Sequence, residues 1–78
     1  MNIQQAIDLC RPKFESQLGD VRAEVMELQQ NTEENTEEYW QTQYETAIID
    51  MALDVCMSLK VPTDLQTIVA AELLGEVI

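Results

Sequence analysis

Acidic side chains are the residues of this sequence with the greatest capacity for chemistry. Fifteen Asp and Glu residues stand against four Lys and Arg, which gives a formal net charge of -11. The sequence contains no histidine, which excludes Ser-His and Cys-His nucleophiles, HExxH zinc sites and Glu-x-x-His di-iron sites. Its two glycines cannot supply a glycine-rich phosphate loop. Carboxylates are therefore the candidates for a functional site.

One group of carboxylates has the spacing of a metal-binding motif. Glu33-Glu34-x-x-Glu37 resembles, over five residues, the Glu-Glu-x-x-Glu motif of all-helical nucleotide pyrophosphohydrolases. The resemblance implies carboxylates one helical turn apart that hold magnesium for phosphoryl chemistry. That family carries a Glu-x-x-Asp motif on its next helix, whereas Asp50 and Asp54 are four residues apart here. We therefore expect no metal, no cofactor and no enzymatic activity, with a small magnesium-dependent hydrolase as an alternative.

The same carboxylates belong to a long acidic stretch. Eleven acids and a single base, Arg22, lie between Glu15 and Asp54. Many are three or four residues apart, where helical neighbours have Cβ atoms about 5–6 Å apart, which is close to the spacing of phosphates along a nucleic-acid strand. A helical surface of this kind can imitate a phosphate backbone. The predicted partner-binding residues are Glu24, Glu27, Glu33, Glu34, Glu37, Glu38, Tyr39, Asp50 and Asp54.

The charge also indicates the class of partner. Direct binding to nucleic acid or to an anionic membrane is disfavoured because both require positive charge. A basic protein surface is favoured, because complementary potentials steer association. Small acidic inhibitors encoded by phages and plasmids act in this way, and the chain is similar to them in size and charge. We expect a non-enzymatic inhibitor or regulator that occupies a basic, nucleic-acid-binding surface; the alternative is that the acids only maintain solubility.

Helices must position these side chains, and the sequence predicts an all-α fold. Apolar residues recur every three or four positions in the first part of the chain, which indicates a single helical stripe; they are Ile3, Ile7, Cys10, Phe14, Leu18, Val21, Val25 and Leu28. Asn2 and Gln5 have the spacing of a capping box. Pro12 lacks an N–H and clashes with the preceding turn. We therefore expect a short helix at about 3–10 and a longer one at about 12–29, with Gly19 as a second candidate break; the alternative is one helix that kinks at Pro12.

Residues 29–36 contain no apolar side chain and predict the connection to the next helix. We expect that helix at about 36–60, with Thr36 as a candidate N-cap. Trp40 and Tyr44 are four residues apart and are expected in the core. The second half of this helix is apolar over more than half of its circumference, so it should contact more than one neighbour.

The last predicted helix, at about 64–75, is apolar on almost every face. Pro62 ends the preceding helix, and Thr63 with Gln66 has the spacing of a capping box. A single helix of a small monomer cannot bury every face, so we expect a homodimer formed through this helix. The predicted self-association residues are Leu65, Ile68, Val69, Leu73, Leu74 and Val77. A structural or assembly protein that acts through this helix is the alternative function, and a helix at the centre of the bundle is the alternative structure.

Two cysteines, Cys10 and Cys56, fall at apolar positions of the helical patterns. We expect both to be small core residues with reduced thiols. The sequence shows no secretory signal, and its longest apolar run is shorter than a membrane span. Residues 1–78 are therefore expected to form one cytoplasmic domain, a bundle of three to four helices.

Overall fold

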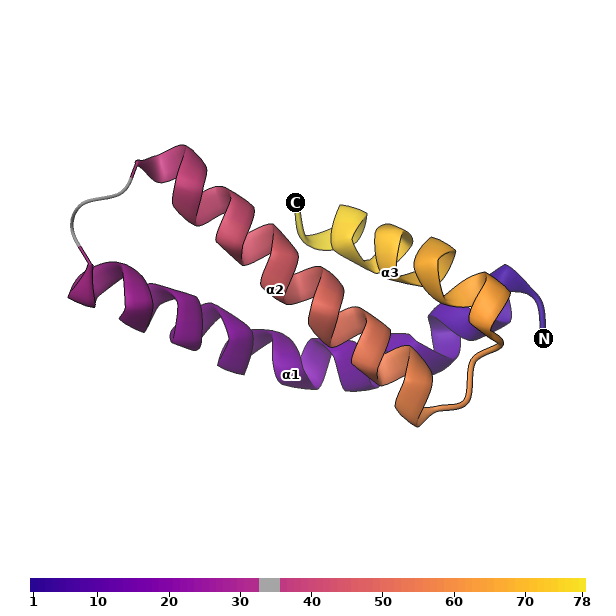
Figure 1. Ribbon diagram of the computed structural model, residues 1–78. Helices are drawn as coiled ribbons and strands as arrows, with labels where there is room; N and C mark the ends of the chain where they lie inside the picture. Colours follow the sequence, from indigo (N-terminus) through magenta and orange to yellow (C-terminus); the bar gives the residue numbers. More distant parts are fainter. Residues whose placement is uncertain (33–35) are drawn as a thin grey trace.

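Three α-helices make up the structure, which is a computed structural model that describes residues 1–32 and 36–78 (Figure 1). Helix α1 spans Ile3–Asn31, α2 spans Glu37–Ser58 and α3 spans Thr63–Val77. The described ranges contain no strand, and none of their helices has the length and apolarity required to cross a bilayer. The predicted all-α bundle is confirmed, with three helices in an elongated molecule of 44 × 19 × 18 Å.

Helix α1 is continuous, so the predicted break at Pro12 is wrong. A proline inside a helix costs about 3 kcal/mol through its missing N–H and its steric clash. Buried side chains lie on both sides of it, with Cys10 before and Phe14 after, and they belong to one stripe facing the core. Burying a large apolar side chain contributes about 1.5–3 kcal/mol, so the continuous stripe outweighs the proline. The helix also continues through Gly19.

Side chains cap the starts of α1 and α2 but not the start of α3. The predicted box at α1 is confirmed: the Gln5 N–H donates to the Asn2 side chain at 2.8 Å, and the Asn2 N–H donates to the Gln5 side chain at 3.0 Å. Thr36 caps α2 by accepting from the Tyr39 N–H at 3.3 Å. The predicted box at the start of α3 is wrong, because Pro62 is the N-cap and makes no side-chain cap. The Gln66 side chain instead donates to the Val61 carbonyl at 3.0 Å.

A tight turn joins α2 to α3 and ends α2 earlier than expected. The Val61 N–H donates to the Cys56 carbonyl at 3.0 Å, and the Lys60 N–H donates to the Met57 carbonyl at 3.2 Å. These two bonds are those of a Schellman motif, in which the residue after the C-cap is left-handed. Lys60 occupies that position with φ 59°, and Val61 is buried beside the end of α2.

The core lies where all three helices meet. Helices α1 and α2 form an antiparallel hairpin, and α3 packs against the half of the hairpin that is remote from the 31–37 connection (Figure 1). As predicted, α2 contacts both of the other helices. The core cluster consists of Ala6, Ile7, Cys10, Phe14, Leu18, Ile48, Met51, Ala52, Val55, Cys56, Val61, Val69, Ala70 and Leu73.

Both cysteines lie in this core, as predicted. Cys10 and Cys56 are fully buried free thiols, and their sulfur atoms are 3.9 Å apart between α1 and α2. Burial and the neighbouring Cys10 raise the pKa of the Cys56 thiol to about 12, because both disfavour the charged thiolate. Cys56 is therefore protonated at neutral pH, and the two cysteines pack as small apolar side chains.

The bundle itself buries much of the apolar surface that the sequence assigned to self-association. Val69 and Leu73 are fully buried against α1 and α2, so these two cannot form a surface for a second copy. Three more of the predicted residues are half-buried against the same core: Leu65, Leu74 and Val77. Of the six predicted residues, Ile68 alone is exposed, at 43%. Helix α3 thus serves mainly as the third wall of the core.

Candidate protein-binding surface

Helix α3 is too short to cover the whole hairpin. Its 15 residues compare with 29 in α1 and 22 in α2, and it ends part-way along the molecule (Figure 1). The uncovered part comprises residues 21–31 of α1 and 37–47 of α2, and we call it the hairpin end. Its one buried side chain among the described residues is Val25. The two helices there are held together without a third, and their apolar side chains reach the surface.

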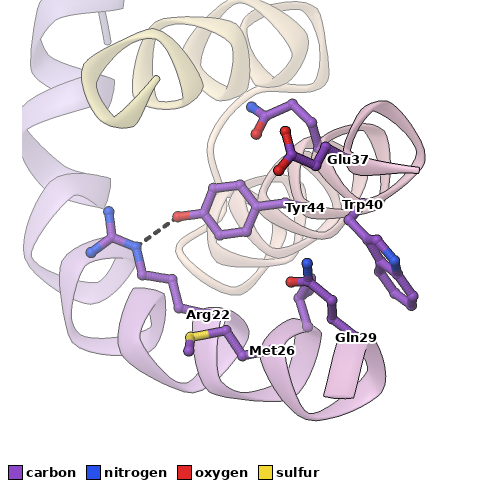
Figure 2. A pocket seen from close by; sticks show the side chains of 8 residues that line it. Arg22, Met26, Gln29, Glu37, Trp40 and Tyr44 are labelled. Carbon is purple, nitrogen blue, oxygen red and sulfur yellow. Dashed lines mark hydrogen bonds between the residues drawn. The ribbon is translucent and has the colours of Figure 1, made fainter. Parts of the chain in front are cut away.

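A groove of about 430 Å³ runs between α1 and α2 at the hairpin end (Figure 2). We call it the Met26 groove. Its lining residues recur every three or four positions along one face of each helix: Arg22, Val25, Met26 and Gln29 from α1, and Glu37, Trp40, Gln41 and Tyr44 from α2. Four of the eight lining residues are apolar or aromatic, and one of these, Met26, is 57% exposed, so this groove offers apolar contacts that are accessible from solvent.

Arg22 and Tyr44 close one end of the Met26 groove. The Arg22 Nε–H donates to the Tyr44 hydroxyl at 2.6 Å, which joins α1 to α2 (Figure 2). Tyr44 also packs against the core cluster, so the groove begins where the three-helix core ends. The bond holds the guanidinium beside the phenol.

A second groove of about 310 Å³ uses other faces of the same two helices. We call it the Leu28 groove. It shares Val25 and Trp40 with the first groove, and its other lining residues are Glu24, Leu28, Thr32, Tyr39, Gln43 and Ala47. Trp40 was expected in the core, but it is half-buried and lies between the two grooves. The prediction was wrong because α3 does not reach this turn of α2.

Tyr39 and Trp40 form an aromatic pair at the start of α2. Their ring centroids are 5.0 Å apart and the ring planes are inclined by 83°, an edge-to-face arrangement that is favourable for aromatic side chains. Tyr39 is 43% exposed. Exposed aromatic rings among acids are suited to contact with Arg side chains of a partner.

Three of the four bases lie at the other end of the molecule, together with eight acids. Arg11 bonds to Asp8 at 3.0 Å and to Glu76 at 2.6 Å, and its pKa is raised, chiefly by the hydrogen bond with Glu76. Lys13 donates to the Ser58 hydroxyl at 2.8 Å, and Lys60 lies in the turn before α3. Arg22 is therefore the one base within the hairpin end.

The fold brings together most of the predicted partner-binding residues. Glu24 and Glu27 on α1 and Glu37, Glu38 and Tyr39 on α2 are all exposed at the hairpin end. Asp50 and Asp54 are exposed too, but they lie further along α2, on the part that packs against the core. Glu33 and Glu34 lie outside the described residues.

Two further findings bear on the nature of the site. In the described ranges, no group of three acidic or cysteine side chains is arranged to hold a metal ion. The chain matches no protein-family model, and comparison with curated proteins and with solved structures gave no match either. Its function must therefore be inferred from the hairpin end itself, where charge and exposed apolar side chains occur together.

Proposed function

We propose that this protein is a non-enzymatic inhibitor or regulator that binds a basic surface of another protein, of the kind that binds nucleic acid. The observation that carries the proposal is the group of exposed carboxylates at the hairpin end, which has a single base among them. The hairpin end carries Glu24, Glu27, Glu37 and Glu38 with one base, whereas the other three bases lie at the opposite end among eight acids. An acidic end of this kind generates a negative potential that attracts a basic partner.

The mechanism is charge neutralisation by a rigid helical scaffold. Exposed carboxylates on α1 and α2 are spaced by helical turns, so they present fixed negative charges to Lys and Arg side chains. A surface that binds phosphates in this way would be blocked for nucleic acid. Binding should weaken steeply as salt rises, because the Debye length falls from about 10 Å at 0.1 M to about 3 Å at 1 M.

Affinity capture from a bacterial lysate at about 0.1 M and about 0.5 M salt tests the proposal, with mass spectrometry to identify the bound protein. We expect a nucleic-acid-binding protein that is retained only at the lower salt. The double variant Glu37→Lys with Glu38→Lys should abolish capture. Asp64→Lys with Glu72→Lys is the matched control, because both residues are exposed on α3 and the change in net charge is the same. Equal loss in both variants, or capture that is unaffected by salt, would contradict the proposal.

A second candidate function is assembly through α3. An apolar groove of about 170 Å³ lies between α2 and α3, lined by Ile49, Leu53, Thr67, Ala70, Ala71 and Leu74, and Ile68 is exposed on the same helix. If a second copy covers this face, Ile68→Asp should convert a dimer to a monomer in analytical ultracentrifugation without unfolding the chain. A monomer at all concentrations in the unmodified protein would exclude this assembly.

A further inference from the structure

We infer that the Met26 groove is the docking site for one amphipathic helix of the partner, a helix with an apolar stripe flanked by Lys or Arg. The inference rests on the proposed function, because it assigns a structure and a chemistry to the basic partner. It also separates two contributions to binding: the carboxylates attract the partner, and the groove holds one particular element of it.

The covered half of the hairpin shows that a helix can pack across α1 and α2. Over its other half, α1 and α2 are covered by a helix, α3, whose Val69 and Leu73 are fully buried between them. Tyr44 contacts that core and also lines the Met26 groove, so the groove adjoins the covered half. Two packed helices offer ridges and grooves that accept a third. A helix from outside would therefore repeat at the hairpin end the packing that α3 makes elsewhere.

The groove walls require an apolar stripe on that helix. Val25 from α1 and Trp40 from α2 line the groove, and Met26 on α1 is a largely exposed part of its wall. Methionine adapts its shape to different partners, and tryptophan is enriched among residues that dominate binding energy. Side chains spaced by three or four residues on a docking helix would match the spacing of these walls.

The charge of the hairpin end favours a basic helix and disfavours a second copy of this chain. Glu37 and Arg22 both line the groove, but the hairpin end around it carries five acids with Arg22 as its one base. A second copy would bring another net charge of -11. Its α3 contains no Lys or Arg but has Asp64, Glu72 and Glu76, so that helix would be repelled. A helix with basic flanks would be attracted to the acids of the hairpin end.

The test uses a synthetic peptide and the intact protein. The lining residues span eight positions on each helix, about 10 Å or two turns, so a tryptophan-free peptide of about 14 residues is long enough. The first probe has a Leu and Ala stripe with Lys flanks. A second has the same composition with the stripe scrambled, and a third replaces Lys by Glu. Trp40 is the only tryptophan and lines the groove, so its fluorescence reports binding directly.

Two methionines supply a matched pair of variants. Met26 is 57% exposed in the groove, and Met57 is 59% exposed near the C-terminal end of α2. Met26→Arg and Met57→Arg add the same charge, so only its position differs. We expect Met26→Arg to weaken binding of the first probe about tenfold or more and Met57→Arg to weaken it less than about twofold. Circular dichroism should show that both variants remain folded.

A second pair of variants tests the same contrast in case one of the methionine variants misfolds. Gln29→Arg places a charge in the groove, and Gln30→Arg places it on the neighbouring exposed position, which lines neither groove. The same contrast in affinity is expected. Equal binding of the scrambled peptide, preferred binding of the Glu peptide, or equal loss within both pairs would overturn the inference.

Two outcomes separate this inference from the proposed function. If partner capture is salt-sensitive and depends on Glu37 and Glu38 but is unaffected by Met26→Arg, the groove inference fails and the proposed function stands. If capture depends on none of these residues, both fail. A dimer of the unmodified protein that Met26→Arg disrupts would overturn the inference in favour of a second copy in the groove.

Discussion

At the residue scale, Lys60 adopts a backbone conformation that suits glycine better. Its φ of 59° lies in the left-handed region, which costs a residue with a Cβ roughly 1 kcal/mol. The Schellman bonds around it and the buried Val61 beside it fix this conformation. Lys60→Gly should therefore raise the free energy of unfolding by about 0.5–1 kcal/mol, as measured by urea denaturation. Lys13→Gly, inside α1, is the contrasting control and should destabilise the protein.

The Cys56 thiol makes the free energy of unfolding depend on pH in the alkaline range. Its thiol has a pKa of about 12 in the fold against an ordinary value near 9.0, so the unfolded chain loses this proton first. The stabilisation is fully present below pH 9 and is lost as pH rises toward 12, at no more than about 1.4 kcal/mol per pH unit. Urea denaturation at several pH values should show the stability difference between the unmodified protein and Cys56→Ala shrinking over this range. A constant difference would show that the thiol ionises alike in both states.

At the scale of the element, α1 is less stable than its length suggests. Gly19 and Pro12 both interrupt its helical propensity, and the described structure leaves open space where a Cβ on Gly19 would lie. Gly19→Ala should stabilise the protein by about 1 kcal/mol, and Pro12→Ala by roughly 2 kcal/mol once the extra entropy of the unfolded chain is subtracted. Thermal unfolding followed by circular dichroism measures both. A destabilised Pro12→Ala would show that α3 requires the local geometry that the proline imposes.

The elements could be predicted from the sequence where local chemistry decides them. The Asn2 box and Thr36 depend on neighbours three residues away, and the apolar stripe of α1 predicted its buried face from Ile7 to Leu18. The continuity of α1 at Pro12 could not be predicted in this way, because it depends on burial against α2 and α3. The lack of a side-chain cap at the start of α3 could not be predicted in this way either, because the preceding turn makes Pro62 the N-cap residue in place of Thr63.

At the scale of the whole molecule, charge could be predicted and shape could not. The acidic stretch was visible in the sequence, and the antiparallel hairpin places Glu24 and Glu27 at the same end as Glu37 and Glu38. The Met26 groove was missed, although the sequence contained a signal for it: the last helix, at about 64–75, was predicted to be half as long as the helix at about 36–60. A short third helix leaves part of a long hairpin uncovered.

The three-helix core covers only one half of the hairpin. Backbone hydrogen exchange should therefore show stronger protection of amides in that half than at the hairpin end. Amides of α1 and α2 beside Leu18 and Ile48 lie in the three-helix core, so they should exchange only through global unfolding. Amides beyond Val21 in α1 and before Ala47 in α2 should exchange through local opening, with protection that decreases toward the 31–37 connection. A ligand that binds the hairpin end would need to hold its two helices together against this local opening. Amide exchange should therefore slow throughout the hairpin end when a ligand binds, including at amides that the ligand does not contact. The size of this slowing would measure the binding free energy of the ligand.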